Sequence, residues 1–125
     1  MTIFDRIIAG EIPSHRVYED DHVFAFLDIG PLARGHTLVV PRESVATLDQ
    51  LTGEAAAAIG RALPRICRAI VKVTGAEAYN VLQNNGAAAG QEVPHVHFHI
   101  IPRFPGQSLA GVEITWKPGK LEGGE

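Results

Sequence analysis

The sequence contains a single cysteine, Cys67, among 125 residues, which excludes an intramolecular disulfide and a cysteine-based zinc finger. No apolar run approaches the roughly 18 residues that a membrane span needs, and residues 1–10 lack the basic and apolar regions of a secretory signal. Positive charge is not in excess either. Eleven Lys and Arg against 14 Asp and Glu leave a net charge of −3, which argues against a dominant nucleic-acid-binding surface. We therefore expect a cytoplasmic protein with neither a membrane nor a nucleic acid as its partner.

A chain of this length forms one domain, and its local patterns predict an α+β fold. Phe4, Ile7 and Ile8 have the spacing of one face of a short helix. A long helix is expected between Thr52, a suitable N-cap, and Gly75, a suitable C-terminal stop. Its apolar stripe consists of Ile59, Leu63, Ile66, Ile70 and Val73. Strands are predicted over 16–19, 23–27, 36–40, 78–83 and 95–101, which indicates an antiparallel sheet packed on the long helix. A Gly- and Pro-rich tail, 106–125, could hold a further short strand over 112–116.

The most distinctive feature is the placement of the histidines. Three of the six fall within five residues, at alternate positions 95, 97 and 99. Alternate side chains of a strand share one face, so the three imidazoles would form a row with neighbours ~6.5–7 Å apart. The apolar residues between them, Val96, Phe98 and Ile100, would then pack on the long helix.

Three interpretations of this row compete. Imidazoles that titrate near neutral pH suit nucleophilic and acid–base chemistry. Three histidines can also bind a catalytic zinc ion, and a third possibility is a polar sheet face without chemistry. Zinc is disfavoured because no glutamate general base stands beside the row; Glu92 lies three residues before it, across Pro94. Solubility explains poorly why the histidines alternate with large apolar residues, so we favour chemistry.

The loop before the histidines, residues 84–91, consists largely of small residues. Small residues let backbone N–H groups approach an anion closely, and Asn84 and Gln91 add side-chain amide donors. An ordinary long hairpin loop is the alternative. Beside three histidines, we expect an anion site.

The sequence from residue 3 to about residue 103 resembles the histidine triad superfamily. The signature is the run His-apolar-His-apolar-His-apolar-apolar at 95–101, and further blocks resemble its branch of small nucleotide-binding proteins. These blocks are 3–4, 7–8, 10–13, 19–21, 26–29, 35–41, 84–86 and 90–94. The resemblance implies a histidine triad domain over 3–105, with a five-stranded antiparallel sheet, one long helix and one or two short helices. It also implies a homodimer whose sheets join into one. We expect no cofactor.

The family's activity implies roles for four histidines. Members bind purine nucleotides and cleave at the α-phosphorus. His97 would be the nucleophile that forms a nucleotidyl-histidine intermediate, and His99 would bind the phosphate and assist the leaving group. His95 would orient the nucleophile, and His36 would be an additional active-site histidine.

The expected reaction is hydrolysis of a purine nucleoside phosphoramidate to the nucleoside monophosphate and an amine. A dinucleoside polyphosphate hydrolase, a nucleotide-binding regulatory protein with incidental turnover and a three-histidine metal protein are the alternatives.

The resemblance also implies a nucleotide pocket. Asp28 would take the ribose hydroxyls. The base would lie among apolar side chains, namely Phe4, Ile7, Phe26 and Ile29. The phosphate would meet the loop residues Asn84, Gly90, Gln91 and Glu92. Since a carboxylate repels phosphate, we expect Glu92 to bind through its backbone N–H or to turn its side chain away.

One departure from the family concerns a structural metal. Many bacterial relatives hold zinc with two N-terminal cysteines, a histidine after the block at 35–41, and the first histidine of the triad. The matching positions here are Thr2, Asp5, Ser44 and His95. Three of the four ligands are missing, so no structural zinc is expected.

Overall fold

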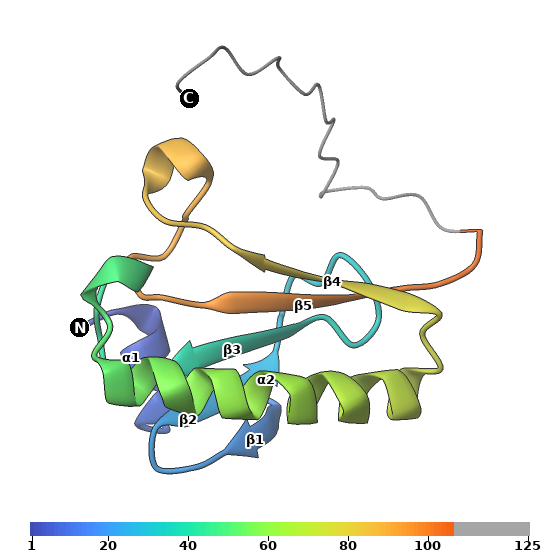
Figure 1. Ribbon diagram of the computed structural model, residues 1–125, viewed down its shortest axis with the longest axis horizontal. Coiled ribbons are helices and arrows are strands. Elements are labelled where there is room, and N and C mark those ends of the chain that lie inside the picture. Colours follow the sequence, from blue (N-terminus) through green and yellow to red (C-terminus); the bar gives the residue numbers. More distant parts are fainter. Residues whose placement is uncertain (107–125) are drawn as a thin grey trace, which may run out of the picture.

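The computed structural model describes residues 1–106 and confirms the α+β class (Figure 1). Its sheet has five antiparallel strands in the order β1-β2-β3-β5-β4. The elements are α1 (Ile3–Ile8), β1 (Arg16–Glu19), β2 (Val23–Leu27), β3 (Thr37–Pro41), the 3₁₀ turn η1 (Leu48–Gln50), α2 (Gly53–Thr74), β4 (Ala78–Gln83), the 3₁₀ turn η2 (Ala87–Ala89) and β5 (Phe98–Arg103). The strand expected over 112–116 lies outside the described residues. No helix in the described part of the chain is long and apolar enough to cross a membrane.

The long helix α2 begins and ends at the predicted caps. The Thr52 hydroxyl accepts a hydrogen bond from the Ala55 N–H, and Gly75 adopts a left-handed φ of 72° that ends the helix. One face of α2 packs on one face of the sheet (Figure 1). The buried residues between the helix and the sheet form the α2 cluster, which contains Val23, Ala25, Val39, Ala58, Ile59, Ala62, Ile66, Cys67, Ile70 and Ile100. Val73 was predicted to belong to the stripe but is 83% exposed. The cluster includes no α2 residue beyond Ile70, so the buried stripe ends before the last turn of the helix.

The opposite face of the sheet carries α1. A second cluster there contains Phe4, Phe24, Phe26, Leu38 and Val40, with Ile7, Ile8 and Val93 packed against it. β2 and β3 therefore bury both of their faces, as their nearly continuous apolar sequences require. His99 pairs with Leu38 in the β3–β5 register, which places its side chain on the α1 face.

The histidine strand is shorter than predicted. β5 begins at Phe98, so His95 and His97 precede it. The β3–β5 pairing extends no further than the pair Val39 and Phe98. The chain bends over residues 93–95, where Pro94 has no N–H to donate to a ladder. The predicted alternation holds within the strand: Ile100 and Phe98 pack in the α2 cluster, and the His97 and His99 rings are neighbours on the other face. Val96, which was also predicted to pack on the long helix, is buried but does not belong to that cluster.

Candidate active site

Two adjoining cavities open on the α1 face of the sheet. One, of about 310 Å³, has a mainly apolar lining that includes Phe4, Ile7, Phe26, Ile29 and Leu38. The other, of about 330 Å³, is more polar, and its lining includes Leu32, His36, Leu82, Asn84 and Gly90. Both cavities are lined by the same four side chains, those of Asp28, Glu92, His97 and His99. The two cavities therefore form one site with an apolar end, a polar end and two histidines at the junction.

His97 lies at this junction as a neutral imidazole. Its Nδ1–H donates a hydrogen bond to the carbonyl oxygen of His95 at 2.8 Å, and a carbonyl can only accept. Nε2 is therefore the nitrogen with the free lone pair. Burial lowers the pKa of His97, against the opposing effect of the His95 carbonyl. The rings of Phe4 and His99, each 5.0 Å away between centroids, hold the imidazole from two sides.

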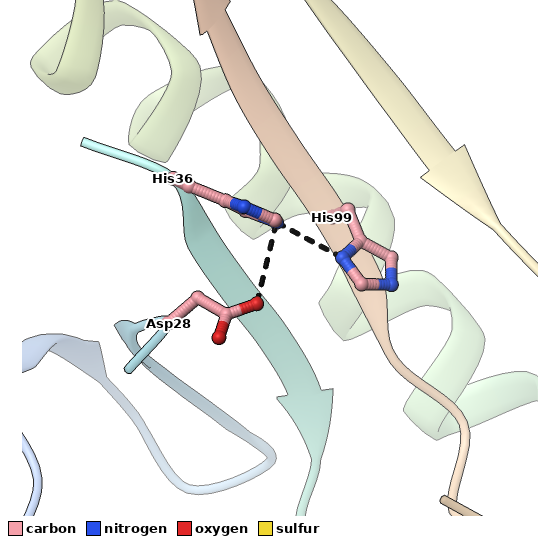
Figure 2. A group of neighbouring side chains, drawn as sticks. All are labelled: Asp28, His36 and His99. Atoms are coloured by element: carbon pink, nitrogen blue, oxygen red, sulfur yellow. Dashed lines mark hydrogen bonds and ion pairs between the residues drawn. The ribbon is translucent and has the colours of Figure 1, made fainter. Parts of the chain in front are cut away.

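His36, the residue just before β3 and not within that strand as predicted, forms a hydrogen-bonded pair with His99 on β5 (Figure 2). The Leu32 N–H donates to His36 Nδ1 at 3.1 Å, so the proton of the neutral ring is on Nε2. That nitrogen lies 3.0 Å from His99 Nδ1 and 3.5 Å from Asp28 Oδ2. His99 Nδ1 is then the acceptor, and among residues 1–106 its Nε2–H has no hydrogen-bond partner, so that it can donate in the site.

The same surroundings keep the pair uncharged. Burial is the largest cause that lowers the pKa of His99 to about 4; the neighbouring His97 and His36 act in the same direction, and Asp28 acts against them. Burial also lowers the pKa of His36, although the nearby Asp28 carboxylate acts in the opposite direction. All three site histidines are thus neutral at neutral pH, and each has a defined tautomer.

The geometry bears on the metal interpretation. Among residues 1–106, the side chains close enough to share a metal ion are Asp28, His36 and His99, whose ligand atoms lie within 4.8 Å of one another. Only one histidine of the triad belongs to this group. A metal on His36 Nε2 would move that proton to Nδ1, where it would face the Leu32 N–H donor. The donor set therefore fits a hydrogen-bonded pair better than a metal site.

His95 lies behind the site and lines neither cavity. Its side chain is completely buried. Its Nε2–H donates to the Pro41 carbonyl oxygen at 2.8 Å, and its Nδ1 lies 3.0 Å from Thr2 Oγ1. Its backbone carbonyl is the acceptor for His97. The predicted orienting residue thus contacts the predicted nucleophile through its main chain.

The loop at the polar end differs in one respect from expectation. Asn84, Gly90 and Glu92 line the polar cavity, but Gln91 lines neither cavity. The Gln91 amide donates to the carbonyl oxygens of Ala46 and Val93 and accepts from the Gly86 N–H. Gln91 therefore braces the loop and offers no free amide to a ligand.

The other predicted pocket residues surround the apolar cavity. Ile29 lines it from an outer position and is 90% exposed. The lining also includes residues that were not predicted, among them Ile3, Ile12, Pro13 and Ser14. Ile12 and Pro13 belong to the sequence block at 10–13, which could have pointed to them. Nothing local marks Leu32, Leu82 or Ile101 in the other cavity.

Comparisons with known proteins agree with this architecture. The HIT domain family model matches residues 9–106. The adenosine 5'-monophosphoramidase hnt1 of Schizosaccharomyces pombe is 45% identical over 114 residues, 91% of this chain and 81% of the relative. A crystal structure of a HIT family member from Bacillus subtilis matches with a TM-score of 0.88 at 46% identity and covers 94% of this chain and 82% of that one. A zinc-bound histidine triad family protein from Mycobacterium smegmatis matches with a TM-score of 0.81 at 37% identity, covering 87% and 79%.

Proposed function

The chain belongs to the HIT domain family, and on this premise we propose that it hydrolyses purine nucleoside phosphoramidates to the nucleoside monophosphate and an amine. The observation that carries the proposal is His97, a neutral imidazole whose Nδ1 is occupied and whose Nε2 is free at the junction of an apolar and a polar cavity. The name of the Schizosaccharomyces pombe relative supports the same reaction.

The two cavities suit the two ends of a nucleotide. The base binds between the apolar side chains of α1 and β2, including Phe4 and Phe26. Asp28 lines both cavities, where a carboxylate can accept hydrogen bonds from the ribose hydroxyls. The phosphate lies in the polar cavity beside Asn84 and His99. Glu92 also lines this region, so the backbone of its loop is the part that suits an anion.

The first step forms a covalent intermediate. The Nε2 lone pair of His97 attacks phosphorus while the bond from phosphorus to the amine nitrogen breaks. When the substrate binds, His99 takes up a proton from solvent on Nδ1, because the charge of the bound phosphate favours the protonated form of that ring. The His36 Nε2–H then turns to Asp28 Oδ2, 3.5 Å away. The departing nitrogen takes the proton on His99 Nε2, which leaves His99 neutral. His97 becomes a cationic nucleotidyl-imidazole that keeps its Nδ1–H on the His95 carbonyl.

The second step releases the nucleotide. Water attacks phosphorus, its proton passes to the now neutral His99, and the bond between His97 and phosphorus breaks. His99 then releases its extra proton to solvent as the nucleotide leaves, so that both histidines return to their neutral starting states. Division into two displacements replaces one difficult transfer with two easier ones.

A homodimer formed through β4 is part of the proposal. β4 is an edge strand with no charged residue in its sequence Ala-Tyr-Asn-Val-Leu-Gln. Tyr79 and Val81 are exposed on it. The other edge strand, β1, carries Arg16 and Glu19, and charged residues protect sheet edges from pairing. Antiparallel joining of two β4 edges would give one continuous sheet.

The deciding experiment compares a purine nucleoside phosphoramidate with a dinucleoside polyphosphate at equal concentration, using the chelator-treated protein. We expect a higher kcat/KM for the phosphoramidate, and a preference for the dinucleotide would favour the sister activity. His97→Ala should abolish turnover but keep nucleotide binding, whereas the matched control His15→Ala, an exposed histidine outside both cavities, should behave as wild type. Full activity of His97→Ala would eliminate the covalent mechanism. Activity lost on chelation and restored by zinc would replace it with the metal mechanism.

A further inference from the structure

The proposed nucleophile stands outside the hydrogen-bond ladder of the sheet. β5 begins at Phe98, one residue after His97. The segment before it is held by single backbone bonds, such as Val96 N–H to the Val45 carbonyl oxygen at 2.9 Å. The position of His97 therefore depends on what holds His95, whose carbonyl receives the His97 Nδ1–H.

His95 is held by a group of polar side chains that we call the Asp5 cluster, consisting of Thr2, Asp5, Ser44 and His95. Asp5 Oδ2 accepts hydrogen bonds from the Thr2 N–H and the Ser44 hydroxyl, each at 2.9 Å. The Asp5 N–H donates to Thr2 Oγ1, which lies 3.0 Å from His95 Nδ1. Asp5 Oδ1 is 3.7 Å from the same nitrogen. The cluster joins the start of α1, the segment after β3 and the segment before β5.

The Asp5 carboxylate is stabilised in its charged form. Partial burial alone would raise its pKa, but the hydrogen bonds from Thr2 and Ser44 outweigh that effect and lower it. A charged acceptor makes stronger hydrogen bonds than a neutral one, which suits Asp5 to hold three chain segments together.

Three members of the cluster, Thr2, Asp5 and Ser44, occupy the positions that the family resemblance matches to zinc ligands, and His95 is the fourth such position and the one retained ligand. Zinc prefers thiolate, imidazole and carboxylate ligands, whereas two of the four side chains here are neutral hydroxyls. Both hydroxyls lie within hydrogen-bond distance of Asp5 Oδ2, and the Thr2 hydroxyl also contacts His95. These residues do not fit a structural zinc ion.

We propose that the Asp5 cluster is a metal-free clamp that positions His97, with Asp5 and Ser44 as its positioning residues. The clamp acts through Thr2 on the His95 ring, and through the His95 carbonyl on the His97 imidazole. Because α1 also supplies Phe4 and Ile7 to the apolar cavity, the same contacts hold that wall of the cavity at a fixed position relative to His97. The kinetic part of this inference rests on the proposed function.

The kinetic test separates positioning from binding. Ser44→Ala removes one hydrogen bond of the clamp and leaves the Thr2–Asp5 cap of α1 intact. Asp5→Ala removes the centre of the cluster. Displacement of a nucleophile by about 1 Å can cost on the order of 100-fold in rate, so we expect kcat to fall by about 3- to 10-fold in Ser44→Ala and by about 10- to 100-fold in Asp5→Ala. KM should change by less than about twofold in Ser44→Ala.

The conservative variant and the control complete that series. Ser44→Thr keeps a hydroxyl and should retain most of the activity. Asp21→Asn, an exposed turn residue outside the cluster, should equal wild type. An unchanged kcat in Ser44→Ala and Asp5→Ala would overturn the clamp, and so would a loss in Ser44→Ala that appears only in KM.

Two readouts do not depend on turnover. Metal analysis of protein exposed to zinc and then dialysed should find far less than one zinc ion per chain; one tightly held ion that Ser44→Ala releases would overturn the metal-free clamp. Imidazole ¹⁵N spectra should show His97 protonated on Nδ1 in wild type and a mixture of tautomers in Asp5→Ala. Unchanged tautomers in Asp5→Ala would contradict the clamp. A wild-type protein that has the expected spectra but hydrolyses no phosphoramidate would refute the proposed function alone.

Discussion

The three neutral histidines of the site predict an unusual loss of stability in mild acid. Burial lowers the pKa of His36, His97 and His99 in the folded protein. Below pH 6.5 the unfolded chain therefore binds protons that the folded chain does not, and the free energy of unfolding falls with falling pH. Each histidine contributes about 1.4 kcal/mol per pH unit at most.

The size of the effect follows from His99. A decrease of its pKa from 6.5 to about 4 corresponds to about 3 kcal/mol of unfolding free energy lost between pH 6.5 and pH 4. This is an upper value, because the ring is partly exposed. His36 and His97 add to the loss in the same direction. The carboxylates Asp5 and Asp20, whose pKa values are lowered from 3.8, lose their stabilising contribution only at more acidic pH.

Urea denaturation followed by circular dichroism measures this slope directly. Curves at about pH 7, 6 and 5 and at one protein concentration give the free energy of unfolding at each pH. His99→Gln removes one titrating group and should reduce the slope by up to about 1.4 kcal/mol per pH unit. The control His15→Gln changes an exposed histidine outside the site and should leave the slope unchanged. Either of two results would refute the assignment of neutral histidines to the site. One is a wild-type free energy of unfolding that stays constant from pH 6.5 to 5, and the other is a slope that His99→Gln does not alter.

Three other perturbations have defined outcomes. Gly35 has a φ of 86°, and the Cβ added by Gly35→Ala would lie 2.7 Å from a side-chain carbon of α2. Urea denaturation should show that Gly35→Ala lowers the free energy of unfolding by about 2–4 kcal/mol. In the control Gly53→Ala, where the added Cβ meets nothing within 4 Å, the decrease should be less than about 1 kcal/mol. In the proposed homodimer, Val81→Lys adds a charge to the β4 edge and should give monomers in light scattering, whereas Val17→Lys on the other edge should keep the wild-type mass; a Val81→Lys protein of wild-type mass would contradict pairing through β4. Asp28→Asn should raise KM for a ribonucleotide substrate about 10-fold but leave KM for a dideoxyribose analogue unchanged. Equal increases for both substrates would refute the proposed contact between Asp28 and the ribose hydroxyls.

The sequence was most informative where a local pattern has one structural solution. Thr52 and Gly75 mark the ends of α2 because a hydroxyl can satisfy free N–H groups and glycine tolerates a left-handed φ. Alternation placed the histidines on one face and Phe98 with Ile100 on the other, even though part of that segment lies outside the strand. Side-chain direction in extended chain does not require a continuous ladder.

The parts that could not be predicted depend on contacts between distant segments. Thr2 and His95 are 93 residues apart in sequence, and neither residue type predicts a contact with the other. Gln91 is a suitable phosphate ligand by its chemistry, but Ala46, on a segment far from it in sequence, accepts its amide hydrogen. The start of β5 is likewise set by where β3 ceases to pair with it. Such features follow from packing and not from local preference.

The charge of the site explains how an acidic protein can suit an anionic substrate. Neither cavity is lined by Lys or Arg within residues 1–106, whereas Asp28 and Glu92 line both. Affinity for phosphate must therefore come from hydrogen-bond donors at short range and not from long-range attraction, which agrees with a net charge of −3. A neutral His99 costs little to bury, and in the proposed mechanism it gains a proton only when phosphate brings negative charge beside it. In that mechanism the bound substrate raises the proton affinity of His99 and solvent supplies the proton, so a pKa of about 4 in the free protein is compatible with the proposed proton transfer near neutral pH.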